Sequence, residues 1–369
     1  MRSISDTISR LQRFTPANPS LASASPAGKL TQLDGFGRNP GELRALLHVP
    51  ADLPTGSPLV LVLHGCTQTA EGYDRGSGWT SLADRFGFAV LFAEQQRANN
   101  SNLCFNWFSP ADIRRGGGEA ESIHEMVRTV VERHSIDASR VFVTGLSAGG
   151  AMTSVMLAAY PEVFAGGAIV AGLPYGVASG VPQAFDRMRG HGYDRAALSG
   201  LVRKASSHRG PWPRVSVWHG TADATVDAVN AAMIVDQWRG LHGVDQPDLT
   251  DRVDGHQHRQ WHDASGRAVI EEHAIAGMGH GTPIATSGDQ ACGAPGPYML
   301  DAGISSTYRI AAFWGIVPAE APRQHAAPAP VRHVPAALTV AQPTPASVAR
   351  FDPGRTINDA IRAAGLLKP

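Results

Sequence analysis

The sequence predicts an α/β fold in which helices cover both faces of a mostly parallel central sheet. Three observations support this fold class. Short apolar runs recur along the chain, segments with helical periodicity alternate with them, and 43% of the 369 residues are hydrophobic, which is enough for one large core. In folds of this class ligands bind beyond the carboxyl ends of the strands, so functional residues are expected in the loops that follow them.

The predicted strands are short and rich in apolar residues. The clearest is 58–64, a continuous apolar run of the kind found in parallel strands that are buried on both faces. The others, in chain order, span residues 43–49, 88–92, 140–143, 167–171, 214–219 and 267–273. Because helical segments separate the strands, parallel pairing is the expected arrangement.

The predicted helices have apolar residues at helical spacing. Residues 120–134 carry five of them on one face: Ile123, Met126, Val127, Val130 and Val131. Further helices are expected at 79–86, 151–160, 229–238 and 304–314. Residues 174–212 have no regular pattern, so we expect them to be irregular and to cap the site.

Composition divides the chain into four parts. Residues 1–28 begin with a short amphipathic helix and continue as a Pro/Ala/Ser linker. Residues 29–316 form the α/β domain, residues 317–350 are a linker rich in Pro and Ala, and residues 351–369 form a short C-terminal helix. We expect the two terminal helices to dock on the domain; contact with a partner or a polymer surface is the alternative.

The charge pattern excludes several classes of partner. Lys and Arg total 32, as do Asp and Glu, so the formal net charge is zero. A balanced chain without a basic run is not expected to bind nucleic acid or an anionic membrane. The sequence also lacks an apolar run long enough to span a bilayer, so we expect no transmembrane segment.

The N-terminus and the cysteines predict a cytoplasmic location. The first residues lack the apolar stretch of a secretory signal peptide. Three cysteines, at positions 66, 104 and 292, are too few for a disulfide framework, so reduced thiols are expected. The alternative is an extracellular protein exported by a non-standard route, in which one cysteine pair forms a disulfide.

The most informative stretch is Gly-Leu-Ser-Ala-Gly at residues 145–149, between a predicted strand and a predicted helix. This context is typical of the nucleophile elbow of the α/β-hydrolase fold. The glycines leave room where the backbones of strand and helix crowd together, and the tight turn exposes the hydroxyl of Ser147. The plainer alternative is that Ser147 only caps the helix.

An acid and a base follow in the order that an α/β-hydrolase requires. Asp223 lies in the loop after the strand at 214–219, and His280 lies between two glycines after the last strand. Asp223 would fix the tautomer of His280, and His280 would take the serine proton. The alternatives are a turn aspartate and an ordinary loop histidine, and Asp227 is a rival acid that we expect to cap the next helix.

Two backbone N–H groups are expected to form an oxyanion hole. One belongs to Ala148, which follows the nucleophile, and the other to Cys66, in the loop after the strand at 58–64. The alternatives for Cys66 are a thiol nucleophile and a buried inert thiol.

Three residues in loops after strands are candidates for substrate binding: Trp107, Leu173 and Tyr175. Ordinary core packing is the alternative for each. The group formed by His256, His258 and the nearby His262 resembles a metal site, but it lacks a carboxylate or cysteine at ligand spacing. We therefore expect no metal.

Taken together, the motifs resemble the poly(3-hydroxybutyrate) depolymerase family of esterases. This family is related to carbohydrate esterase family 1, which includes feruloyl and acetylxylan esterases. The motifs occur in the expected order between residues 40 and 316: Leu-His-Gly-Cys-Thr-Gln at 63–68, Asn-Trp-Phe at 106–108, Gly-Leu-Ser-Ala-Gly-Gly-Ala-Met at 145–152, Trp-His-Gly at 218–220 with Asp223 and Val226, and Gly-Met-Gly-His-Gly at 277–281.

The resemblance implies a serine esterase that acts through an acyl-enzyme, without a metal or an organic cofactor. It assigns the nucleophile to Ser147, the acid to Asp223, the base to His280 and an oxyanion donor to Cys66. The implied substrate is a hydroxyalkanoate polyester or its oligomers. The alternatives are a feruloyl or acetylxylan esterase acting on plant polysaccharide, and a non-catalytic protein that binds polyester granules.

Overall fold

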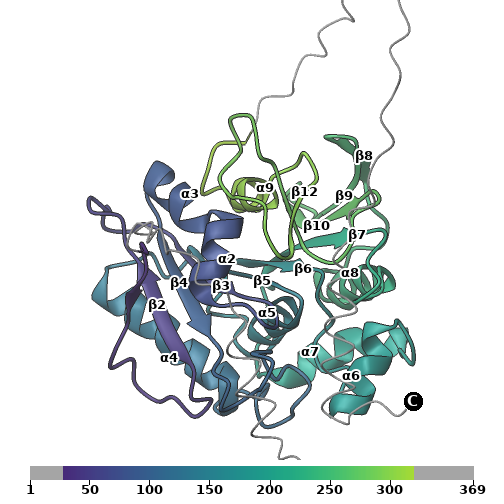
Figure 1. Ribbon diagram of the computed structural model, residues 1–369. Helices are drawn as coiled ribbons and strands as arrows, with labels where there is room; N and C mark the ends of the chain where they lie inside the picture. The colour runs from purple at the N-terminus through teal and green to yellow at the C-terminus, as the bar shows by residue number, and fades with distance from the viewer. Residues whose placement is uncertain (1–27, 320–369) are drawn as a thin grey trace, which may run out of the picture.

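A computed structural model describes residues 28–319 of the chain (Figure 1). The predicted terminal helices and most of the 317–350 linker lie outside these residues. The described part contains a ten-stranded sheet in the order β1-β2-β4-β3-β5-β6-β7-β10-β9-β8. None of the helices within residues 28–319 has the length and apolar character needed to cross a membrane.

The six central strands are parallel, which confirms the predicted arrangement. They are, in chain order, β3 (Leu59–Leu63), β4 (Ala89–Glu94), β5 (Val141–Leu146), β6 (Gly166–Val170), β7 (Arg214–Gly220) and β10 (Ala268–Ile275). Antiparallel strands flank them: β1 (Thr31–Gln32) and β2 (Arg44–His48) on one side, β9 (His256–His262) and β8 (Leu249–Val253) on the other.

The sequence of β3 shows why the sheet is covered on both faces. All five of its residues are fully buried. Leu59, Leu61 and Leu63 pack into one hydrophobic core, whereas Val60 and Val62 pack into a second core on the opposite face. Side chains alternate between the faces of a strand, so a continuous apolar run supplies both cores at once.

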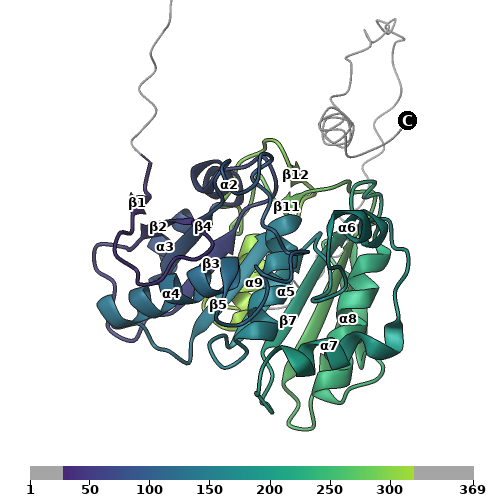
Figure 2. The ribbon, with the colours of Figure 1, turned by 90° about the horizontal axis from the view of Figure 1, so that it is seen from below.

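Helices form a layer on each face of the sheet. One core contains residues of α4 (Gly118–Arg133), α5 (Ala148–Ala159), α7 (Leu198–Ala205) and α8 (Val229–His242). The other contains residues of α2 (Ala70–Ser77), α3 (Trp79–Phe86) and α9 (Ser306–Trp314). Figure 2 shows the first group in front of the sheet and α9 behind it.

The expectation for residues 174–212 is wrong in part. This segment contains α6 (Val181–Met188), a 3₁₀ turn (Arg195–Ala197) and α7. Each of these elements has at most eight residues, and glycines at 190 and 192 separate α6 from the 3₁₀ turn, so a helical period does not persist along the sequence.

The strands β8 and β9 were also not expected. Both are rich in polar residues, and β8 is largely exposed, so neither has the apolar pattern on which strand prediction depends. Two further short strands, β11 (Thr282–Ile284) and β12 (Met299–Asp301), pair in parallel as a separate sheet.

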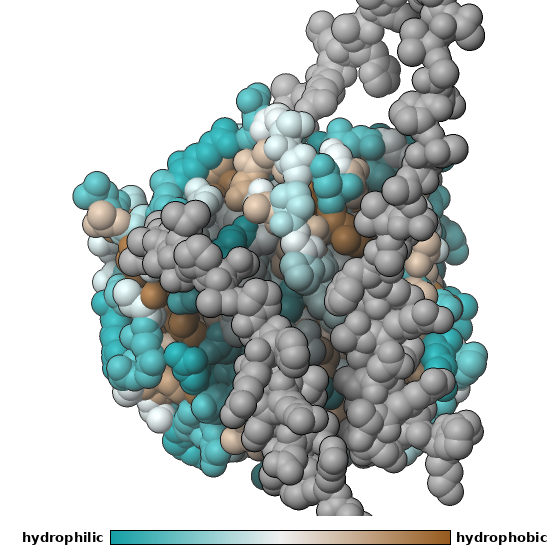
Figure 3. Space-filling model, in the orientation of Figure 1, coloured by the Kyte–Doolittle hydropathy of each residue, from teal (hydrophilic) through white to brown (hydrophobic). Residues whose placement is uncertain are grey.

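The described surface is mostly hydrophilic in the view of Figure 3, and its apolar residues form small separate spots. Among the described residues, the large hydrophobic side chains that are exposed are Val229 and Leu249. Both are exposed by less than two fifths, so neither indicates a broad apolar surface.

Candidate active site

The turn from β5 into α5 holds Ser147 in a conformation that few non-glycine residues adopt. Its φ is +58°, in the left-handed region. A Cβ added to Gly145 would lie 2.7 Å from the carbonyl oxygen of Leu63, and one added to Gly149 would lie 2.5 Å from that of His64. Both positions therefore require glycine, as the elbow motif predicts.

The structure brings Ser147, His280 and Asp223 into one hydrogen-bonded chain. His280 Nε2 lies 2.9 Å from Ser147 Oγ, and His280 Nδ1 lies 2.7 Å from Asp223 Oδ2. The three residues follow β5, β10 and β7, whose carboxyl ends meet at one edge of the sheet. Residues 133 positions apart in the sequence thus contact one another directly.

The surroundings of Asp223 keep its carboxylate ionised and oriented. Its side chain is fully buried, and Oδ1 accepts hydrogen bonds from the N–H groups of Thr225 and Val226, at 2.8 and 2.9 Å. Burial raises the pKa of Asp223, but hydrogen bonds from His219 and His280 outweigh it and hold that pKa well below its usual range. The carboxylate therefore presents Oδ2 to His280 as a fixed acceptor.

The rival acid, Asp227, has a different position. Its Oδ1 accepts a hydrogen bond from the N–H of Val229, the first residue of α8, at 2.9 Å. This contact satisfies a donor in the first turn of the helix, as expected for a capping residue.

The expectation of reduced thiols is wrong for two of the three cysteines. Cys66 and Cys104 form a disulfide, whereas Cys292 is free. A bridged sulfur is not a nucleophile, so the thiol alternative for Cys66 is excluded. The two cysteines are 38 positions apart in the sequence, which gives no sign that their loops are adjacent.

The loop that contains Cys66 leaves one backbone donor free. The N–H of Gly65 donates to Gln68 Oε1 at 2.8 Å, and that of Thr67 donates to the carbonyl of Asn102 at 2.6 Å. The N–H of Cys66 has no acceptor among residues 28–319. Ala148 is the first residue of α5, where backbone donors lack intrahelical acceptors. Both groups are thus available to an oxyanion.

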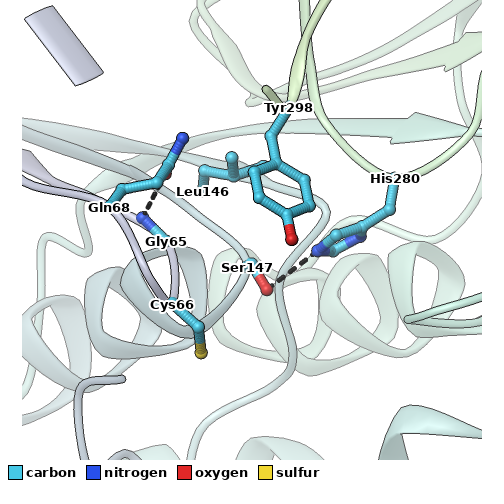
Figure 4. Close-up of a pocket in the computed structure, with 7 residues that line it drawn as sticks. All are labelled: Gly65, Cys66, Gln68, Leu146, Ser147, His280 and Tyr298. Atoms are coloured by element: carbon cyan, nitrogen blue, oxygen red, sulfur yellow. Dashed lines mark hydrogen bonds between the residues drawn. The ribbon is translucent and has the colours of Figure 1, made fainter. Parts of the chain in front are cut away.

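A small cavity of about 10 Å³ lies beside Ser147. Its lining residues are Gly65, Cys66, Gln68, Leu146, Ser147, His280 and Tyr298 (Figure 4). In Figure 4 the Tyr298 ring points from above toward Ser147 and His280.

Sequence reasoning missed Tyr298. Its ring lies edge-on to His280, with the ring centroids 6.1 Å apart, and its φ is +62°. Its carbonyl accepts a hydrogen bond from the N–H of Thr282, at 2.7 Å, beside the pairing of β11 with β12. This contact between two short neighbouring segments has no motif in the sequence.

The three residues expected to bind substrate do not line this cavity. Trp107 and Leu173 are buried in the hydrophobic core, and Tyr175 packs against that core. The backbone N–H of Tyr175 donates to Gln237 Oε1. A role for these residues in substrate binding stays a prediction.

The three histidines that resemble a metal site in the sequence do not converge. His256 Nε2 lies 3.0 Å from the carbonyl oxygen of Ala302, and His262 pairs with Asp248. His258 instead faces two residues of β10, Glu271 and His273.

Comparison with known proteins gives concordant matches. Residues 44–259 match the family described as esterase PHB depolymerase. The chain is 48% identical over 300 residues to poly(3-hydroxyalkanoate) depolymerase C of Paucimonas lemoignei, covering 80% of this chain and 72% of that protein. It is 33% identical over 265 residues to an acetylxylan esterase of Coprinopsis cinerea, covering 70% of each. The solved acetyl xylan esterase from Aspergillus awamori has a TM-score of 0.62 and 28% identity, covering 69% of this chain and 94% of that chain.

The expected cytoplasmic location is wrong. The depolymerase and the acetylxylan esterases to which the chain is similar are secreted, extracellular enzymes. The disulfide between Cys66 and Cys104 agrees with this correction, because disulfides persist in oxidising surroundings and are rare in the cytosol.

Proposed function

Because this chain belongs to the esterase PHB depolymerase family and is a carboxylic ester hydrolase, we propose that it cleaves hydroxyalkanoate polyesters or their oligomers, with Ser147 as nucleophile. The observation that carries the assignment of the site is the continuous relay from Ser147 through His280 to Asp223, with separations of 2.9 and 2.7 Å. The similarity to a poly(3-hydroxyalkanoate) depolymerase supports the substrate class.

The first half of the reaction forms an acyl-enzyme. His280 Nε2 accepts the proton of Ser147 as Oγ attacks the ester carbonyl carbon, and Asp223 stabilises the resulting imidazolium. The N–H groups of Cys66 and Ala148 donate to the oxyanion. The tetrahedral intermediate then expels the alcohol, which receives its proton from His280.

The second half releases the acid. His280 accepts a proton from water while the water oxygen attacks the acyl carbon. The intermediate collapses, Ser147 Oγ leaves, and His280 returns the proton to it. All proton transfers use one imidazole, whose Nδ1–H stays hydrogen-bonded to Asp223 throughout.

A second candidate substrate is an acetylated xylan. The acetylxylan esterase of Coprinopsis cinerea and the solved acetyl xylan esterase favour it. A feruloyl ester, whose aromatic acid would require a flat apolar slot beside the serine, is the third substrate that the rate comparison includes.

A rate comparison tests the proposal. The full chain would be assayed on a soluble hydroxybutyrate oligomer, methyl ferulate and an acetylated xylan oligomer, with Ser147→Ala as the blank. We expect the highest kcat/KM on the hydroxybutyrate oligomer. A higher value on the acetylated xylan oligomer would replace the substrate class and leave the mechanism in place.

The mechanism has a separate test. A fluorophosphonate probe forms a covalent bond with an activated serine, and we expect it to label Ser147 in the native chain. Absence of labelling together with absence of a rate above the blank would favour the non-catalytic, granule-binding alternative.

A further inference from the structure

A second group of chemically reactive side chains lies away from the triad, where β9 pairs with β10. It consists of His258 on β9 and of Glu271 and His273 on β10. All three residues are buried, and one atom from each lies within 4.8 Å of the others. Glu271 Oε2 is 3.7 Å from His258 Nε2 and 3.6 Å from His273 Nε2.

The hydrogen bonds of His258 define which of its nitrogens carries a proton. Nδ1 lies 2.8 Å from Asp251 Oδ1, so Nδ1–H donates to that carboxylate. In the neutral imidazole Nε2 then carries a lone pair. Nε2 is buried, faces Glu271 Oε2, and has no hydrogen-bond partner in the part of the chain that the structure describes.

Two acceptors that face each other in a buried place require a cation between them. A shared proton would draw the two atoms to a hydrogen-bond distance of about 2.7–2.9 Å. The observed 3.7 Å is too long for such a bond. It is close to the separation of about 3.3–3.6 Å between two ligand atoms that bind one zinc ion at about 2.0–2.2 Å in tetrahedral geometry.

The surroundings orient all three groups. Ser216 Oγ–H donates to Glu271 Oε1 at 2.6 Å, which leaves Oε2 directed at the imidazoles. The ring of Trp218 stacks on His273 with the centroids 3.7 Å apart. Such outer contacts, and above all the carboxylate on the distal nitrogen of a histidine, are typical of metal ligands in proteins.

A cavity of about 320 Å³ borders the cluster and supplies room for water in the remaining coordination positions. Two arginines, Arg214 and Arg309, lie in its wall. Arg309 pairs with Asp254 at 2.8 Å, and Arg214 donates to the carbonyl of Ala268 while its guanidinium lies over the ring of Phe313.

We propose that His258, Glu271 and His273 bind a divalent transition-metal ion of the zinc class. Two imidazoles and one carboxylate suit such ions better than calcium or magnesium. The ion would link β9 to β10, and the chain continues from β10 into the loop that carries His280. The ion would lie outside the catalytic triad. Its role would therefore be structural: it would stabilise the folded chain and take no part in ester hydrolysis.

Metal titration of the chelator-treated full-length chain tests the proposal. We expect one Zn²⁺ per chain to remain after gel filtration, and Co²⁺ to produce the visible absorption bands of a protein-bound ion. At a hundredfold excess over its Kd, Zn²⁺ should raise Tm by about 5 °C. Uptake of less than a fifth of an equivalent by the wild-type chain would overturn the proposal, whatever the variants do.

Variants locate the ion. His258→Ala and His273→Ala should each abolish stoichiometric uptake and the rise in Tm. Glu271→Gln keeps the acceptor for Ser216 but removes the charge, so it should weaken binding at least tenfold while its Tm in chelator stays near that of the wild type. His262→Ala is the matched control, because His262 is on the same strand and also pairs with an aspartate, Asp248.

Unchanged uptake in the double variant His258→Ala/His273→Ala would place the ion elsewhere and overturn the assignment. A purely ionic cluster of imidazolium and carboxylate groups makes a different prediction. It would give a Tm that varies with pH in chelator but does not respond to Zn²⁺, and that result would also overturn the proposal.

Discussion

His280 Nδ1 lies 2.7 Å from Asp223 Oδ2, while the other carboxylate oxygen of Asp223 accepts two backbone N–H groups. The carboxylate is thus held from one side and directed at the imidazole from the other. Because the two carboxylate oxygens have different partners, replacing the carboxylate with an amide of the same shape should change the tautomer of His280.

In Asp223→Asn, the amide oxygen should take the position of Oδ1, where the N–H groups of Thr225 and Val226 require an acceptor. The NH₂ group would then face His280 Nδ1 and force it to accept, which places the ring proton on Nε2. An imidazole in that tautomer cannot take the proton of Ser147. We expect kcat to fall by about 10³–10⁴ with little change in Tm.

The matched control is Asp227→Asn, which keeps an acceptor for the first turn of α8. Its kcat should stay within about twofold of the wild type. Steady-state kinetics on a soluble ester checks both variants, and a comparable loss in the two would contradict the assignment of the acid to Asp223.

The disulfide between Cys66 and Cys104 covalently links two loops. One contains Cys66, whose N–H is the expected oxyanion donor, and the other spans residues 100–106. In Cys104→Ala, we expect the free energy of unfolding to fall by about 2–4 kcal/mol, as is usual when a disulfide is removed. We also expect kcat to fall by about tenfold, because the N–H of Cys66 is no longer held in place.

Denaturant titration and kinetics measure the two effects of removing the bridge. Cys292→Ser is the control, because Cys292 is the free cysteine and should leave kcat unchanged. An unaltered kcat in Cys104→Ala would mean that the loop at 65–68 keeps its geometry without the bridge.

Tyr298 covers one side of the cavity at Ser147. If its ring positions the substrate and shields His280 from water, Tyr298→Phe should keep kcat/KM within about threefold, whereas Tyr298→Ala should lower it by about tenfold, equivalent to about 1.4 kcal/mol. Equal losses in the two variants would instead assign the effect to the hydroxyl group.

Local patterns in the sequence account for the residues that could be predicted. Ser147, Asp223 and His280 each lie in a glycine-containing turn after a predicted strand, and the order of the three is a rule of the fold. The positions of Tyr298 and of the pair formed by Glu271 and His258 instead depend on the pairing of β11 with β12 and of β9 with β10, and polar or very short strands such as β9, β11 and β12 have no apolar pattern that predicts them.

Other features left no signal that sequence reasoning could use. The polar strands β8 and β9 lack an apolar period, and the adjacency of Cys66 and Cys104 depends on how two loops meet. The predicted location was wrong because it rested on the expectation of reduced thiols and on the first residues of the chain.

The last prediction concerns His242, in the final turn of α8. Burial lowers the pKa of His242 to about 4 from 6.5, although its Nε2–H donates to the carbonyl of Pro213 at 3.1 Å. Between these two values the unfolded chain binds more protons at this residue than the folded chain does. The free energy of unfolding should therefore fall as pH falls from about 6.5 to 4, by about 2–3 kcal/mol for this group.

His242→Gln keeps a donor for Pro213 but does not titrate, so its stability should vary less over that pH window than the stability of the wild type. Denaturant titrations at pH 7.5 and 4.5 measure the difference, and carboxyl groups common to both chains cancel in the comparison. His262→Gln, on the more exposed strand β9, serves as the control for removing a histidine. Parallel pH profiles for the wild type and His242→Gln would show that the half-buried imidazole of His242 stays solvated in the folded chain, and would contradict the prediction.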